Sequence, residues 1–167
     1  MKQMQMLLLN DIEKGYITGL FDGEGYISIN KVQKRAYRNS VAYGRKYTTY
    51  RLHVRLGSTN REVLEWLLDM VGGYIYDHNV DPSTGMPRGN RKESWTWHIG
   101  GRVTRPFLEL IQPFCKIKRP QVDLALAFLD LGSEYCPETR FEFYEQMLKL
   151  NQRGAVDRLS ETTGEDP

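Results

Sequence analysis

Three glycines spaced four residues apart constrain the fold of this chain more than any other feature of its sequence. On a helix, Gly15, Gly19 and Gly23 lie on one face and leave it without side chains. Each glycine costs a helix roughly 1 kcal/mol relative to alanine, so a helix with three of them usually has a second backbone close to that face. The stripe therefore predicts a helix that begins near Asn10 or Asp11, ends near Gly23 and packs closely against another helix.

The end of this helix carries two acids in an unfavourable electrostatic position. We expect Gly25 to end the helix in a left-handed turn. Asp22 and Glu24 then lie at the negative end of the helix dipole, where carboxylates are disfavoured. Because a bound cation would relieve this repulsion, the two acids indicate a function more than a contribution to stability. The apolar side of the helix is predicted to consist of Leu9, Ile12, Tyr16 and Leu20.

Length and composition fit one globular domain with a hydrophobic core of its own. The chain has 167 residues, of which 40% are hydrophobic and 26% charged, so it is neither a disordered nor a membrane protein by composition. The apolar run over residues 6–9 is too short to span a membrane, and no signal-peptide pattern is present. Cys115 and Cys136 lack the CxxC spacing of a zinc site. We therefore expect an intracellular protein with no membrane partner.

The charges are distributed unevenly along the chain. No acid lies between Glu24 and Glu62, whereas from Asp130 to the end acids outnumber bases nine to four. A basic half beside an acidic half favours a polyanion bound to one face of the protein. The acid-free stretch contains Lys31, Lys34, Arg35, Arg38, Arg45, Lys46, Arg51, Arg55 and Arg61.

Hydrophobic periodicity predicts an α+β fold in which one face of a four-stranded sheet is left open. Period-two alternation indicates strands over residues 26–38, 47–57, 74–79 and 93–99, with a polar, basic turn over residues 36–44. Helical patterns follow the possible cap residues 58–60 and begin again near Thr104, Val122 and Pro137. The order is therefore helix, two strands, helix, two strands, then helices that cover one face of the sheet.

The open face is the predicted nucleic-acid surface. Arg51, His53 and Arg55 alternate with the apolar residues of one strand, and such side chains suit phosphate oxygens and base edges in the major groove. The candidate DNA-binding residues are Ser28, Asn30, Lys34, Arg35, Arg38, Arg51, His53, Arg55, Tyr76, His78, Thr96, His98 and Lys116.

The sequence Ile17-Thr18-Gly19-Leu20-Phe21-Asp22-Gly23-Glu24-Gly25 resembles the nine-residue signature of the LAGLIDADG homing endonucleases. It keeps both acidic positions, with Glu at the second, and has Thr18 and Gly23 in place of the usual alanines. The order of elements and the segment 112–118 are also similar to this family. The resemblance covers a core of about residues 9–132, within a single domain over residues 1–167. It implies an αββαββα fold with an antiparallel saddle-shaped sheet, followed by a helical extension over 133–155 and a tail over 156–167.

The resemblance also implies roles for individual residues. The catalytic acid is Glu24, and the backbone carbonyl of Gly23 serves the same metal ion. Lys118, with Lys116 as the alternative, supplies a cation near the scissile phosphate. Ser58 is the best match for a polar residue that orders water, although Ser58 or Asn60 can equally be a helix cap.

A single copy of the signature implies a homodimer. The expected interface consists of the glycine stripe Gly15, Gly19 and Gly23, with Asp22 at the helix ends. Two Glu24 carboxylates near a two-fold axis would need a counter-ion, and an all-oxygen site suits Mg²⁺, with Mn²⁺ or Ca²⁺ as substitutes. The implied reaction is metal-dependent hydrolysis of both strands of a long, near-palindromic DNA target, in an enzyme encoded by an intron rather than an intein.

Two other functions are compatible with the same scaffold. An RNA-binding intron maturase would keep the basic saddle and bind its intron RNA. A non-catalytic DNA-binding regulator would need neither Glu24 nor Lys118.

Overall fold

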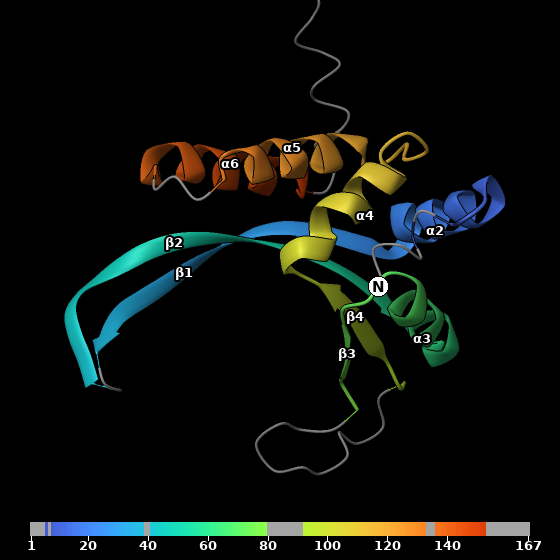
Figure 1. Cartoon of the computed structure of the whole chain (residues 1–167), viewed down its shortest axis with the longest axis horizontal. Coiled ribbons are helices and arrows are strands. Elements are labelled where there is room, and N and C mark those ends of the chain that lie inside the picture. Colours follow the sequence, from blue (N-terminus) through green and yellow to red (C-terminus); the bar gives the residue numbers. More distant parts are fainter. Residues whose placement is uncertain (1–5, 7, 39–40, 80–91, 133–135, 153–167) are drawn as a thin grey trace, which may run out of the picture.

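The computed structural model describes residues 6, 8–38, 41–79, 92–132 and 136–152, and its elements follow the predicted αββαββα order (Figure 1). Helix α2 precedes two long strands, and helix α3 precedes two short ones. Further helices follow, so the predicted α+β class is confirmed. The elements are α2 (Asp11–Glu24), β1 (Gly25–Arg38), β2 (Val41–Ser58), α3 (Arg61–Met70), β3 (Tyr74–Asp77), β4 (Trp95–Ile99), the short 3₁₀ helix η1 (Gly101–Val103), α4 (Thr104–Ile111), α5 (Arg119–Asp130) and α6 (Pro137–Leu150).

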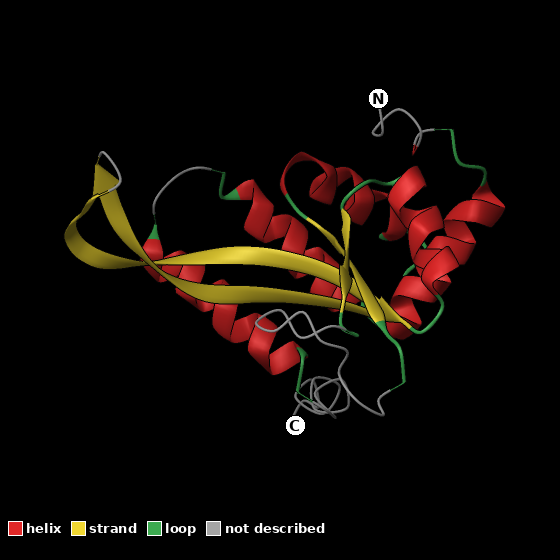
Figure 2. Cartoon of the chain, turned by 90° about the horizontal axis from the view of Figure 1, so that it is seen from below, coloured by secondary structure: helices red, strands yellow, loops and turns green. Residues whose placement is uncertain are grey.

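The four strands form one antiparallel sheet in the order β1-β2-β4-β3. The sheet is strongly curved, and α4, α5 and α6 lie over its convex face (Figure 1). Seen from below, the strands lie in front of the helices (Figure 2). No helix covers the concave face in the part of the chain that the structure describes. None of the described helices is both long and apolar enough to cross a membrane.

The core joins the sheet to the helices through aromatic contacts. Phe107 of α4 packs edge-on against Phe21 of α2 and against Trp97 of β4, with ring centroids 5.3 Å apart in both pairs. The indole N–H of Trp97 donates a hydrogen bond to the carbonyl oxygen of Gly72, 2.8 Å away. This bond fixes the turn after α3, where Gly72 and Gly73 both have positive φ angles. The contact of Phe21 with Phe107, which in turn packs on Trp97, holds the C-terminal half of α2 against the sheet.

The predicted apolar side of α2 is wrong in part. The buried face of the helix carries Ile17 and Phe21, whereas Ile12 is 84% exposed and Tyr16 53% exposed. Two apolar stripes run along this helix, and the glycines lie beside the one that faces outward. Periodicity alone does not tell which stripe faces the protein's own core. The cap is confirmed as Asn10, whose side chain accepts the N–H of Glu13 in a reciprocal capping box.

Gly25 does not adopt the predicted left-handed turn. Its φ of −73° is extended, and the strand β1 begins there. A side chain is excluded for another reason, because a Cβ built on Gly25 would lie 2.6 Å from the ring of Phe21. Glycine thus lets the first residue of β1 pass directly over the ring of Phe21.

The predicted turn over residues 36–44 is also wrong. The backbone pairing of β1 and β2 continues to Arg38 opposite Val41, with one irregularity between Lys34 and Ala36. Only residues 39 and 40, which lie outside the described residues, separate the two strands. The polar and basic composition of residues 36–44 has no apolar alternation from which a strand could be predicted.

Candidate nucleic-acid interface and active site

The strand register gathers most of the predicted DNA-binding residues on the concave face. Directly opposed residues of antiparallel strands share a face. Tyr26, Arg55, His98 and Tyr74 form one such row across all four strands. The same parity places further predicted residues on this face, and they are Ser28, Asn30, Lys34, Arg51, His53, Thr96 and Tyr76. His78 joins them, since its Nε2 lies 2.9 Å from the Oγ1 of Thr96.

A cluster of aromatic and basic side chains lies in the middle of this face. The rings of His53 and His98 stack with centroids 5.2 Å apart and an interplanar angle of 12°. The guanidinium of Arg55 lies 5.3 Å from the ring centroid of Tyr26. Tyr74 packs edge-on against His98, and its hydroxyl is hydrogen-bonded to the Nδ1 of that histidine. We call these five residues the histidine cluster.

The surroundings of the histidine cluster disfavour the charged imidazolium. Burial lowers the pKa of His53, and the positive charges of Arg55 and Arg51 lower it further. Burial likewise lowers the pKa of His98, with smaller contributions from His53 and Arg55. Both rings are therefore neutral at neutral pH. The buried Nε of Arg55 and Nε2 of His98 have no hydrogen-bond partner among the described residues.

The remaining predicted contacts have different surroundings. Ser28 is only 6% exposed, so its hydroxyl lies beneath its neighbours on the concave face. Lys34 and Arg35 border a shallow concavity of the hairpin together with Lys46. The side chain of Arg38 lies outside the described part of the structure. Lys116 is not on the sheet, because it belongs to the loop that packs against the end of α2.

The predicted catalytic residues Glu24 and Lys118 lie at the C-terminal end of α2. Glu24 is the exposed last residue of that helix. The Lys118 ammonium donates hydrogen bonds to the carbonyl oxygen of Asp22 and to that of Gly23, the latter at 3.3 Å. Two segments that are almost a hundred residues apart in sequence thus bring a cation next to the carbonyl that precedes Glu24. These carbonyls are the negative end of the helix dipole, which favours a cation here.

Ser58 lies on the other side of the sheet. It is opposite Trp95 in the register, on the same face as the buried Leu56 and Trp97. Its hydroxyl oxygen accepts the N–H of Asn60 at 3.0 Å, and Asn60 caps α3 by accepting the N–H of Val63. The observed bonds of Ser58 therefore belong to the start of α3, and its role in ordering water stays a prediction.

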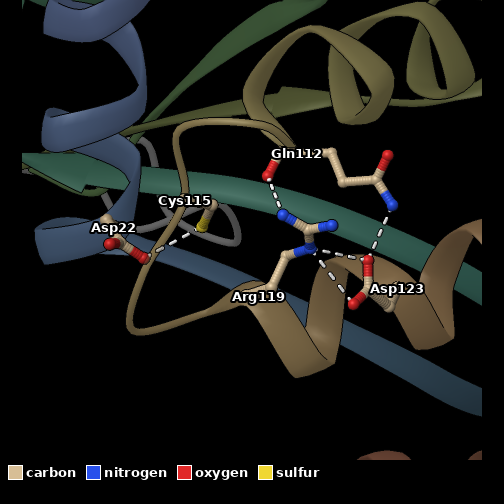
Figure 3. Close-up of polar contacts among 5 residues, drawn as sticks. All are labelled: Asp22, Gln112, Cys115, Arg119 and Asp123. Atoms are coloured by element: carbon tan, nitrogen blue, oxygen red, sulfur yellow. Dashed lines mark hydrogen bonds and ion pairs between the residues drawn. The ribbon is translucent and has the colours of Figure 1, made fainter.

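Asp22 is turned inward, where it binds the loop that carries Lys118. Its Oδ1 accepts the thiol of Cys115 at 3.0 Å and the N–H of Lys118 at 2.7 Å. Its Oδ2 accepts the N–H groups of Lys116 and Ile117, both at 2.9 Å. Figure 3 shows the carboxylate of Asp22 directed from α2 toward Cys115. This contact is not predictable from local sequence patterns, because the partners are 93 to 96 residues apart.

The pKa values of this pair reflect the same geometry. Burial would raise the pKa of Asp22, but the hydrogen bonds from Cys115 and from the three N–H groups outweigh it and lower the pKa to about 2. Burial, together with the adjacent carboxylate, raises the pKa of Cys115 to about 12. At neutral pH the loop is therefore held by a charged carboxylate and by a thiol that stays protonated and unreactive.

The bare face of α2 points away from the protomer. A Cβ placed on Gly15, Gly19 or Gly23 would meet no atom within 4 Å. The exposed side chains of Ile12 and Tyr16 lie on the same helix. Within one chain, the glycine stripe thus contacts nothing among the described residues, although glycine is a costly choice on a helix.

A complete metal site is not found within the described part of one chain, where no three His, Cys, Asp or Glu side chains come together. The available donors are the carboxylate of Glu24 and the carbonyl oxygen of Gly23. Oxygen donors of this kind suit a hard divalent cation such as Mg²⁺, which usually keeps several waters or phosphate oxygens as its other ligands.

The chain is thus an α+β protein with a helix-backed, curved sheet, a cationic open face and an acid at the edge of that face. Solved structures make the assignment of the fold specific. The homing endonuclease I-CvuI, solved in complex with DNA in the presence of Mg, superposes with a TM-score of 0.63 at 16% identity, over 93% of this chain and 97% of that one. The archaeal intron-encoded homing endonuclease I-Vdi141I, also complexed with DNA, has a TM-score of 0.64 at 18% identity, over 86% and 87%.

The homing endonuclease I-TnaI gives a TM-score of 0.61 at 17% identity, over 92% of this chain and 97% of that one. A mutant of I-SmaMI matches 87% of this chain but only 47% of its own, with a TM-score of 0.54. No protein-family model matches the sequence, and neither does any curated protein. The chain therefore has the fold of the LAGLIDADG homing endonucleases, as the nine-residue signature predicted.

Proposed function

We propose that this chain is a homodimeric, site-specific DNA endonuclease that makes double-strand breaks in a long, near-palindromic target. The observation that carries the proposal is the position of Lys118, whose ammonium lies on the Gly23 carbonyl next to the exposed Glu24. An acid, a carbonyl and a lysine at one helix end, beside an open cationic sheet, suit phosphodiester hydrolysis. An intron origin and an intracellular location belong to the same proposal.

The outward glycine stripe supports the homodimer. Two copies of α2 that pack through Gly15 and Gly19 about a two-fold axis would place both Glu24 residues near that axis. The two concave faces would then form one continuous surface for duplex DNA. The match to about half of the longer I-SmaMI chain is in keeping with an assembly of two such folds.

The active site requires contributions from beyond one chain. Glu24 and the Gly23 carbonyl would hold Mg²⁺, with Mn²⁺ or Ca²⁺ as substitutes, and the partner protomer and DNA phosphates would supply further oxygen ligands. The bound ion supplies Lewis-acid stabilisation of phosphate oxygens and a more acidic bound water. Lys118 stabilises the negative charge that develops on the scissile phosphate. The histidine cluster and Arg51 bind phosphates and read base edges.

The decisive experiment compares cleavage and binding for Glu24→Gln. A library of DNA duplexes is incubated with the protein and Mg²⁺, and the cleaved target is identified by sequencing. We expect Glu24→Gln to abolish cleavage of this target while DNA binding is retained, because only the metal-binding carboxylate is lost. Glu142→Gln, an exposed acid on α6, is the matched control and should cleave normally.

The outcomes separate the proposed endonuclease from its alternatives. Normal cleavage by Glu24→Gln contradicts the catalytic assignment. If the wild-type protein binds one duplex tightly but cleaves none, the non-catalytic regulator is the better description. A preference for structured intron RNA over every duplex would favour the maturase.

A further inference from the structure

We propose that Asp22 is a positioning residue that acts through Lys118, and this inference rests on the proposed endonuclease function. Asp22 lies only two residues from Glu24, yet the two acids have opposite environments. Asp22 is 9% exposed, whereas Glu24 is exposed at the end of α2. The roles of the two acids therefore differ: Glu24 faces the substrate, and Asp22 fixes the cation beside it.

Asp22 holds Lys118 at both ends. Its carboxylate oxygen Oδ1 accepts the backbone N–H of Lys118 at 2.7 Å, which fixes the start of the lysine side chain. Its backbone carbonyl accepts a hydrogen bond from the Lys118 ammonium, which fixes the other end. A lysine side chain is flexible, and holding both ends removes much of that freedom. The ammonium is consequently confined to the end of α2, next to Gly23.

The carboxylate has no acceptor capacity left for another role. A carboxylate offers about four lone-pair sites. Both oxygens of Asp22 accept two hydrogen bonds each, from Cys115 and Lys118 on one side and from Lys116 and Ile117 on the other. A metal ion or a partner chain would have to displace these donors. Asp22 therefore supports the active site from within its own chain.

A second clamp at the loop's other end makes the positioning rigid. Arg119 donates to the carbonyl oxygen of Gln112 at 2.7 Å and to both carboxylate oxygens of Asp123, at 3.0 and 3.1 Å. The side chain of Gln112 also donates to Asp123, at 2.7 Å (Figure 3). The loop from Gln112 to Lys118 is thus tied to α5 by one clamp and to α2 by the other.

The test is a double-mutant cycle between Asp22→Asn and Lys118→Met. Single-turnover cleavage of the selected duplex is measured at saturating protein and Mg²⁺, and DNA affinity is measured in Ca²⁺. Removal of the lysine is expected to lower the cleavage rate about 10²-fold, as for other groups that stabilise transition-state charge. Asp22→Asn is expected to lower the rate about tenfold or more. The N–H₂ group of the asparagine is a donor, so it cannot accept the hydrogen bonds of the loop N–H groups. DNA affinity should change less than about threefold.

The double variant gives the discriminating result. If Asp22 acts through Lys118, the double variant should cleave no more than about threefold more slowly than Lys118→Met alone. Losses that multiply instead would overturn the inference. Val71→Ala, which removes buried volume at the end of α3, is the control for a general loss of stability, and its effect should multiply with that of Lys118→Met.

A measurement without DNA separates this inference from the proposed function. Amide hydrogen exchange of residues 116–118 should be slow in the wild-type protein and faster in Asp22→Asn, and Cys115→Ala, which keeps the carboxylate, should give a smaller acceleration. Unchanged exchange in Asp22→Asn would show that the carboxylate does not hold the loop. Protected amides in a wild-type protein that cleaves no duplex would contradict the endonuclease while leaving the loop contact intact.

Discussion

Alanine at Gly15 and Gly19 should stabilise the protomer and weaken the dimer at the same time. Neither position has an atom within 4 Å of a new Cβ, so the folded protomer accommodates both methyl groups without strain. Alanine is better than glycine in a helix by about 0.8–1.0 kcal/mol per residue, which gives about 1.5–2 kcal/mol for the pair. A gain of this size in a variant that loses function would identify glycine's role as intermolecular.

The two alanines become unfavourable only in the dimer, where two copies of α2 pack closely. Each methyl group would then have to fit between the two backbones, and overpacking of this kind costs about 1–3 kcal/mol per site. The double variant carries four new methyl groups per dimer, so its dissociation constant should rise at least tenfold, which corresponds to about 1.4 kcal/mol. Cleavage of a two-strand target should fall with the dimer population.

Sedimentation over a concentration series measures the dimer, and urea unfolding below the dissociation constant measures the protomer. Gly100→Ala is the matched control, since Gly100 has open space around it, has an extended backbone and lies outside α2. It should leave self-association unchanged. A Gly15→Ala, Gly19→Ala protein that dimerises as tightly as the wild type would refute the reasoning, because the glycine stripe would then not be the interface.

Three other predictions concern the concave face and the end of α2. Arg55→Ala should weaken binding of the target duplex by about 1–3 kcal/mol in a fluorescence anisotropy titration, and unchanged affinity and specificity would mean that β2 does not face the groove. The lowered pKa of Asp22, about 2 against 3.8, should contribute about 2 kcal/mol of stability above about pH 4 that is lost as the pH falls toward 2, and Asp22→Asn should lack this acid-sensitive part of the unfolding free energy. The lowered pKa values of His53 and His98 make the unfolded chain the stronger proton acceptor, so stability should fall as the pH drops below 6.5, less steeply when both residues are Gln; equal slopes would count against neutral rings in the folded protein.

Local patterns in the sequence were sufficient for the elements and for their order. The alternation of Leu52, Val54 and Leu56 with basic residues predicted both the strand β2 and its two faces. The position of Asn60 ahead of an apolar helix predicts it as a possible cap, and in the structure it caps α3. Such signals act between neighbours in the chain, so they survive without knowledge of the tertiary structure.

Apart from the two turns predicted at Gly25 and over residues 36–44, the errors and omissions concern contacts between distant parts of the chain. Nothing local distinguishes the apolar stripe of Ile17 and Phe21, which meets Phe107, from the stripe of Ile12 and Tyr16, which stays exposed. The bonds between Asp22 and the loop before α5 likewise depend on how α2 and α4 pack. Tertiary packing decides these questions, and a single sequence records it only indirectly.

The spacing of the two acids shows how one helix end can serve both structure and chemistry. Residues two apart on an α-helix point in directions about 200° apart, so Asp22 and Glu24 cannot both face the interior or both face the substrate. In the structure, Asp22 is turned toward the loop that carries Lys118, and Glu24, the last residue of α2, is exposed. A shift of either acid by one position would turn its carboxylate by about 100° around the helix, away from its observed direction. The two-residue spacing therefore lets one helix end hold Lys118 from inside through Asp22 and present the free carboxylate of Glu24 outside.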